Sequence, residues 1–184
     1  MKATLFCNIF LMEELMKLVV FSDSHGGGIY IKKALQMHRD ADAAIFLGDG
    51  LWDFLPLKAQ FPNTAFFAVR GNCDIGSSLC SDVPLTEELT LDGYKLFFCH
   101  GHTYGVKYGY ESIIGAARAR GADAVLFGHT HIRTERYLPE DEDGGALYLI
   151  NPGSIGGRGE GCIKSYCIVR LEKSGILVCH AQVR

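Results

Sequence analysis

The sequence lacks an excess of positive charge, which argues against a general binder of nucleic acids or membrane surfaces. Its 184 residues include 18 Lys and Arg against 21 Asp and Glu, for a formal net charge of −3. A general binder of polyanions would carry a basic stripe. The charge balance therefore indicates no stable nucleic-acid or membrane partner, whereas it leaves a homo-oligomer open.

The sequence also lacks any C-x-x-C pair, although it contains seven cysteines. An odd set without paired spacing resembles neither a zinc ribbon nor a disulfide framework. Several of the cysteines lie in apolar stretches, where a free cysteine usually acts as a small buried hydrophobic residue. A reducing compartment fits this pattern best, so we predict a cytoplasmic protein.

No apolar run is long enough to span a bilayer. The apolar segment 3–12 ends at Glu13 and Glu14, and no small-residue cleavage site follows it. This segment is an upstream extension, a mis-assigned start, or a helix or strand packed on the body, and the sequence leaves these alternatives open. With no repeats and no long linker, we expect residues 1–15 to form an N-terminal extension of uncertain status and residues 16–184 to form a single domain.

Short apolar runs that alternate with helical periodicity predict an α/β fold. Helical character is expected at 29–38, at 51–59 with an interruption at Pro56, and at 111–120. Asp92-Gly93 between two β-prone runs is a strong hairpin signal. From Arg133 onward the chain is expected to be antiparallel β. The predicted strands are 17–21, 43–47, 64–69, 87–91, 94–99, 124–127, 133–138, 146–150, 162–171 and 176–180.

Five of the predicted strands end in polar residues flanked by glycine. Ligands of open α/β sheets bind just outside the carboxyl ends of the strands, so these side chains are expected to meet at one site. Five of the seven histidines lie in these tips, beside two aspartates. The tips carry Asp23 and His25, Asp49, Asn72, His100 and His102, and His129 and His131.

The number and type of these side chains predict a site for two divalent ions. Seven candidate ligands exceed the four that a tetrahedral zinc site takes. Asp49, alone between glycines, is the best candidate to bridge the ions, because a carboxylate has two oxygens. Such a centre attracts phosphate, lowers the pKa of a bound water towards ~7, and positions hydroxide for in-line attack.

The sequence resembles the calcineurin-like metallophosphoesterases, and among them the small YfcE-like phosphodiesterases. The resemblance covers about residues 16–184 and implies a four-layer α-β-β-α sandwich of two facing mixed sheets. It also implies that Asp23, His25, Asp49 and His131 bind one metal. Asp49, Asn72, His100 and His129 would bind the other. The matching motifs are 23–25 (DSH), 48–50 (GDG), 71–74 (GNCD), 99–102 (CHGH), 128–131 (GHTH) and 151–154 (NPGS).

The resemblance implies a binuclear-metal-dependent phosphodiesterase in which a metal-bound hydroxide attacks a small phosphodiester, such as a nucleotide. Asn72, His100 and His102 are the expected catalytic residues. Mn²⁺ is the expected ion, with Ni, Zn, Fe and Co as alternatives for a mixed nitrogen and oxygen site. Two other functions stay open: a non-catalytic scaffold of the same fold, as in the retromer subunit, and a phosphomonoesterase.

Cys73 departs from the wider superfamily, in which a histidine often follows Gly-Asn and can protonate the leaving group. A thiol with a pKa near ~8.5 is a poor substitute for an acid poised near neutrality. We therefore predict dependence on good leaving groups and a preference for diesters over monoesters. Asp74 would then have no histidine to orient and would only cap a turn.

Three residues are predicted to contact substrate: Asn72, His102 and Arg158. His102 contacts substrate, supports the ligands, or is simply solvated. Arg158 suits a phosphate because its guanidinium is planar, but within a glycine-rich segment it is equally a flexible surface charge. Lys107 is a weaker candidate, and an exposed loop residue is the alternative.

Overall fold

A computed structural model describes residues 16–76, 80–142, 144–157 and 163–184 of the chain. The first of its two five-stranded sheets has the order β10-β9-β1-β2-β3. In this sheet β1, β2 and β3 are parallel, whereas β9 and β10 run antiparallel to their neighbours. Its strands are β1 (Met16–Phe21), β2 (Ala43–Phe46), β3 (Ala65–Ala68), β9 (Ser165–Glu172) and β10 (Gly175–Gln182).

The second sheet has the order β4-β5-β6-β8-β7. The expected antiparallel run after Arg133 is wrong at one point, because β8 pairs parallel with β6. Burial explains the placement: β8 has a nearly continuous buried pattern, which suits a strand inside the sheet, and the more exposed β7 takes the edge. The strands are β4 (Thr86–Leu91), β5 (Tyr94–Cys99), β6 (Ala124–Leu126), β7 (Thr134–Leu138) and β8 (Leu147–Asn151).

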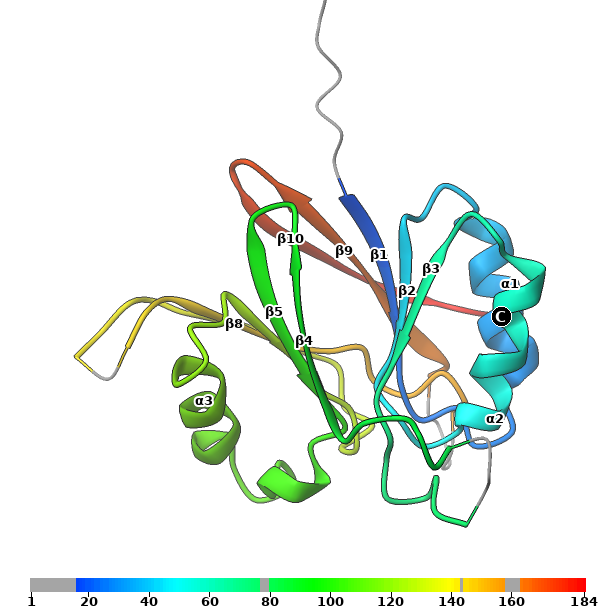
Figure 1. The fold of residues 1–184 in the computed structure, drawn as a ribbon, viewed down its shortest axis with the longest axis horizontal. Coiled ribbons are helices and arrows are strands. Elements are labelled where there is room, and N and C mark those ends of the chain that lie inside the picture. Colours follow the sequence, from blue (N-terminus) through cyan, green and yellow to red (C-terminus); the bar gives the residue numbers. More distant parts are fainter. Residues whose placement is uncertain (1–15, 77–79, 143, 158–162) are drawn as a thin grey trace, which may run out of the picture.

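Helices cover the outer face of each sheet, so the fold has four layers (Figure 1). Here α1 (Gly28–Met37) and α2 (Leu51–Phe54) lie on the first sheet, and α3 (Glu111–Arg118) lies on the second. The predicted helix at 51–59 is divided: α2 ends at Phe54, and the 3-10 helix η1 (Leu55–Gln60) follows with Pro56 in its first turn. A second 3-10 helix, η2 (His102–Tyr104), follows β5 and was not predicted.

The alternation of side chains along β1 divides the interior into separate cores. Leu18 and Val20 face the second sheet and contribute to the core between the two sheets. Val19 and Phe21 point the other way and pack with residues of α1 and α2. Both faces of the strand are thus buried, which fixes its register and the position of the polar residues after Phe21.

The described residues leave some predictions without a structural test. The predicted strand 162–171 starts at Ser165 in the structure, and Cys162 lies outside the described residues, as do residues 1–15. No helix in the described part of the chain is long and apolar enough to cross a membrane.

Candidate metal centre

The loops after β1, β2, β5 and β6 bring six of the seven predicted metal ligands together in two groups. Both groups have ligand atoms within 4.8 Å of one another. The seventh, Asn72, is exposed on the loop after β3, and its side-chain amide donates a hydrogen bond to the Cys73 sulfur at 3.3 Å. The first group is Asp23, His25 and His131, and the second is Asp49, His100 and His129.

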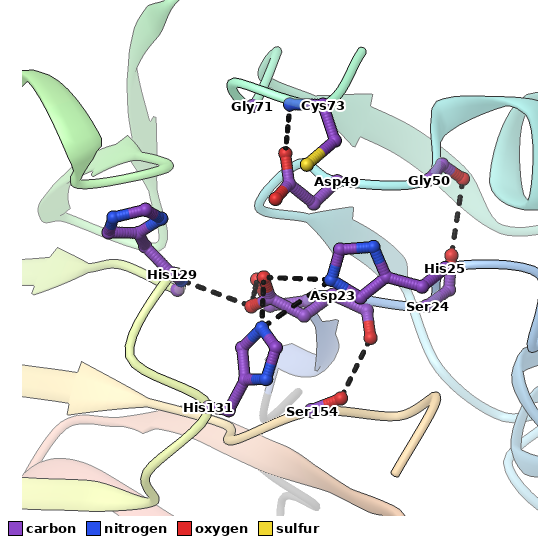
Figure 2. A network of polar contacts seen from close by, with 12 residues as sticks. Asp23, Ser24, His25, Asp49, Gly50, Gly71, Cys73, His129, His131 and Ser154 are labelled. Atoms are coloured by element: carbon purple, nitrogen blue, oxygen red, sulfur yellow. Dashed lines mark hydrogen bonds and ion pairs between the residues drawn. The ribbon is translucent and has the colours of Figure 1, made fainter. Parts of the chain in front are cut away.

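Asp23 divides its two carboxylate oxygens between the scaffold and the first group. Oδ2 accepts hydrogen bonds from the Ser22 hydroxyl and from the backbone N–H of His129. Among the described residues Oδ1 has no hydrogen-bond partner, although it is buried, and it lies 3.1 Å from Nε2 of His131 and 3.8 Å from Nε2 of His25. The two imidazole nitrogens are 3.4 Å apart. A buried carboxylate oxygen facing two imidazole nitrogens is the arrangement that a cation would satisfy (Figure 2).

The second group gathers around Nε2 of His100, which lies 3.4 Å from Oδ2 of Asp49 and 3.2 Å from Nδ1 of His129. The other ring nitrogen of His100, Nδ1, lies 2.7 Å from the backbone oxygen of Leu47. Because a carbonyl can only accept, His100 donates its Nδ1 proton there. In the neutral ring this leaves the lone pair of Nε2 facing the group, as a metal ligand requires.

Asp49 connects the two groups. Besides its contact with His100, it forms a further potential ligand set with His25 and Cys73, so its carboxylate lies between the groups. Its Oδ1 accepts a hydrogen bond from the backbone N–H of Cys73 at 2.7 Å. Burial alone would raise the pKa of Asp49, but His100 and Cys73 hold it far below its usual range. The carboxylate is therefore ionised at neutral pH.

Electrostatics give the histidines of the second group different proton affinities. Burial opposes a charged His100, yet its contact with Asp49 and the nearby Asp23 raise its pKa above the ordinary value. Burial and the charges of His100 and Lys107 lower the pKa of His129 to about 4. His129 is therefore neutral at neutral pH, whereas His100 binds a proton more readily than an ordinary histidine, and a metal ion would compete with that proton.

The backbone itself is unusual at the candidate ligands. Among the described residues, six non-glycine residues have a positive φ, and five of them belong to the two groups. A non-glycine residue in this region costs free energy, and such residues concentrate at functional sites. The sixth is Asp92, in the turn between β4 and β5. The five are Asp23 (φ 55°), His25 (45°), Asp49 (63°), His129 (66°) and His131 (61°).

Asp74 stabilises the strained loop that carries Asp49. Its side chain is buried, with 1% relative exposure, and accepts four backbone hydrogen bonds. Oδ2 accepts from the N–H groups of Asp49 (2.7 Å) and Gly71 (2.9 Å), whereas Oδ1 accepts from Gly50 (2.8 Å) and Leu51 (2.9 Å). From the sequence, Asp74 was expected only to cap a turn. Its bond to the N–H of Asp49 was not expected, because the two residues are 25 positions apart in the chain.

The 151–154 motif supports the other ligand loops. Asn151, at the end of β8, donates from Nδ2 to the backbone oxygen of Gly128 at 2.9 Å and to the Thr130 hydroxyl at 3.1 Å. It thereby fixes the segment that carries His129 and His131. The Ser154 hydroxyl donates to the backbone oxygen of Asp23 at 2.8 Å. The motif therefore positions the loops that carry the candidate ligands.

Cys73, at the position where the wider superfamily often has a histidine, borders the site beside His25 and Asp49. Burial, followed by the hydrogen bond and charge of Asp49, raises the pKa of its thiol to about 11. The thiol is therefore an even weaker acid than the sequence alone suggested. His102 lies beside the second group, its ring centroid 5.4 Å from that of His100 and 6.1 Å from that of His129, with both ring pairs tilted. Arg158 lies outside the described residues.

Comparison with known proteins tests the family predicted from the motifs. Residues 16–174 match the calcineurin-like phosphoesterase superfamily domain. The chain is 31% identical over 165 residues to the probable metallophosphoesterase YsnB of Bacillus subtilis, with 89% of each chain covered. This confirms the family predicted from the motifs.

Solved structures share the fold. A Streptococcus pneumoniae protein described as a predicted phosphoesterase matches with a TM-score of 0.73 and 23% identity, over 91% of this chain and 90% of its own. A structure described as a novel archaeal phosphodiesterase matches with a TM-score of 0.66 and 26% identity, over 90% and 100%. Chaetomium thermophilum Vps29 matches with a TM-score of 0.64 and 17% identity, over 90% and 97%. The expected α/β sandwich of two mixed sheets is thus confirmed.

Proposed function

The chain belongs to the calcineurin-like phosphoesterase superfamily, and we propose that it is a phosphodiesterase that uses two divalent metal ions. The observation that carries the proposal is the pair of ligand groups that Asp49 connects. Asp23, His25, Asp49 and His131 would bind one ion. Asp49, Asn72, His100 and His129 would bind the other. Mn²⁺ is the proposed ion, and Ni, Zn, Fe or Co would also suit this mixture of ligands.

The donor set fits such ions on grounds of charge as well as position. Asp23 is fully buried, and its Oδ1 finds no hydrogen-bond partner in the described part of the chain. The His100 proton on Nδ1 is committed to Leu47, and His129 has a pKa of about 4, so both rings can offer a lone pair. Bound at these groups, divalent ions would lower the pKa of a water towards about 7 and neutralise charge on a phosphate.

The protein's own residues would then orient the substrate and stabilise charge. Asn72 is exposed beside Cys73 and can donate its amide N–H to a phosphate oxygen. His102 lies next to His100 and His129, where its ring can contact the phosphate or the leaving group. Cys73, with a pKa of about 11, would protonate a departing alkoxide poorly. The reaction would therefore depend on leaving groups that depart without a proton, and would favour diesters.

The test is hydrolysis of bis-p-nitrophenyl phosphate and p-nitrophenyl phosphate by metal-stripped protein before and after addition of Mn²⁺. We expect no activity without metal, restored activity with it, and faster turnover of the diester. Asp49→Asn should abolish this activity, whereas the exposed turn variant Asp92→Asn should retain it. Activity on neither ester, despite bound metal, would favour the scaffold function. Faster turnover of the monoester would favour a phosphomonoesterase.

A further inference from the structure

One carboxylate oxygen of Asp53 binds both chain neighbours of the candidate ligand His25. Its Oδ2 accepts a hydrogen bond from the Ser24 hydroxyl at 2.7 Å and another from the backbone N–H of Gly26, also at 2.7 Å. Ser24 is buried, with 1% relative exposure, and Asp53 is half-buried. Because an ionised carboxylate is a strong acceptor, these two bonds fix the chain on each side of His25.

Asp53 belongs to the segment that carries Asp49, the candidate bridge. It lies in the first turn of α2, and its own N–H donates to the backbone oxygen of Gly50 at 2.9 Å. Two further contacts join the same segments: the N–H of His25 donates to the backbone oxygen of Asp49 at 3.2 Å, and the Ser24 hydroxyl lies 3.3 Å from the backbone oxygen of Gly50 (Figure 2). The loop after β1 is thus attached at three consecutive residues to the loop after β2.

His25 needs such support, because its backbone has a φ of 45°, which costs free energy for a residue with a side chain. The two loops also approach each other closely at Gly50. A Cβ on Gly50 would overlap the Ser24 hydroxyl and lie 3.2 Å from Oδ2 of Asp53, so the contact leaves room only for glycine. The position of the His25 ring relative to Asp49 therefore depends on the contacts that Asp53 supplies.

We propose that Asp53 is a positioning residue for the ion of the first group: it holds His25 where that ion needs its imidazole. This inference rests on the proposed two-metal function. A purely structural role would be different. Oδ1 of Asp53 lies against the first residue of α1, since a Cβ on Gly28 would be 3.2 Å from it, and a negative charge there stabilises the start of a helix. That role depends on the charge of Asp53, whereas positioning of His25 depends on its acceptor oxygen.

The experiment is calorimetric titration of metal-stripped variants with Mn²⁺. Asp53→Ala should weaken the binding of one of the two ions by about tenfold or more, the usual effect of losing a group that orients a metal ligand, and leave the other unchanged. Asp53→Asn removes the charge but keeps an amide oxygen that can accept both hydrogen bonds, so it should restore most of that affinity. Asp123→Ala is the matched control. Asp123 is also half-buried and accepts a backbone hydrogen bond, from Lys95 at 2.7 Å, but at the start of β5, whereas His100 follows the end of that strand.

Two further backgrounds identify the ion that Asp53 affects. His25→Gly and His129→Gly each remove one ligand, from the first and the second group respectively, and glycine suits their positive φ values. In His25→Gly, Asp53→Ala should have no further effect on the remaining ion. In His129→Gly it should weaken the remaining ion by about tenfold. Equal losses in both backgrounds, or Ala and Asn variants that lose stability alike while binding both ions normally, would overturn the inference.

Nuclear magnetic resonance of the metal-free protein separates the failure of this inference from the failure of the proposed function. In Asp53→Ala the Gly26 N–H should exchange faster with solvent and the ring signals of His25 should shift, whereas Asp123→Ala should change neither. If the wild type binds no Mn²⁺, the proposed function fails, and these signals still show whether Asp53 holds His25. An unchanged Gly26 N–H and His25 ring in Asp53→Ala would overturn the inference in either case.

Discussion

Replacing Asp74 by Asn tests whether one buried carboxylate holds the loops of the site together. The change keeps the size of the side chain but exchanges one acceptor oxygen for an NH₂ group. Two of the four backbone N–H groups that Asp74 now binds would then face a donor. Each hydrogen bond to a charged group contributes about 1.5 to 3 kcal/mol, so we expect a loss of about 3 to 5 kcal/mol in the free energy of unfolding.

The measurement is urea unfolding of metal-free wild type and variant. Because small proteins have free energies of unfolding of about 5 to 15 kcal/mol, the variant should remain folded at low temperature. Asp92→Asn is the matched control, since Asp92 is exposed and Asn tolerates its positive φ. That variant should change the free energy of unfolding by less than about 0.5 kcal/mol.

The same variant should also affect catalysis, because Asp74 fixes the N–H of Asp49. A misplacement of about 1 Å can cost about a hundredfold in rate, so Mn²⁺-restored diester hydrolysis should fall by about that factor. The reasoning would be refuted if the free energy of unfolding of Asp74→Asn lay within about 1 kcal/mol of the wild-type value and the variant kept its Mn²⁺-dependent activity.

Three further predictions concern residues beside the groups. Cys73→His should raise monoester turnover relative to diester turnover by about tenfold or more, because an imidazole is a stronger acid than a thiol with a pKa of about 11; an unchanged ratio of the two initial rates would contradict this. Gly71→Ala should abolish activity and weaken Mn²⁺ binding, since the added methyl group would collide with the Asp49 carboxylate. Full Mn²⁺-dependent hydrolysis of bis-p-nitrophenyl phosphate by this variant would show instead that the loop can adjust. Because the pKa of His129 is lowered to about 4, the unfolded chain binds a proton more readily between pH 6.5 and about 4, and the metal-free protein should lose stability as the pH falls through that window. His129→Gln should remove about 1 to 2 kcal/mol of this loss, after allowance for solvent screening. The same pH dependence of the free energy of urea unfolding in wild type and variant would count against this.

The sequence was sufficient to predict the strands and the polar residues at their ends. The apolar runs before Asp23, Asp49, His100 and His129 are short and bounded by glycine, so local pattern alone determines where each strand stops. The sequence was less informative about pairing. That β8 pairs parallel with β6 depends on burial on both faces of the strand, which forms only when the second sheet and α3 come together.

The supporting contacts were also beyond the sequence. The hydrogen bonds of Asp74 and Asn151 join segments that are more than twenty residues apart, and no spacing rule connects such segments. Positive φ values at ligands such as Asp49 and His131 could not be read from residue type, because aspartate and histidine usually adopt other conformations. The motif therefore identified the candidate ligands, and the three-dimensional structure explained how they are held.

The measurement that tests the central claim most directly is a calorimetric titration of metal-stripped protein with Mn²⁺, compared with the same titration of Asp49→Ala. If Asp49 connects two ligand groups, the wild type should bind two ions per chain, and the variant should lose at least one and bind the other more weakly. Unfolding measurements on both proteins would show that the variant is folded. A wild type that binds only one ion, or a variant that binds two with unchanged affinity, would contradict the account.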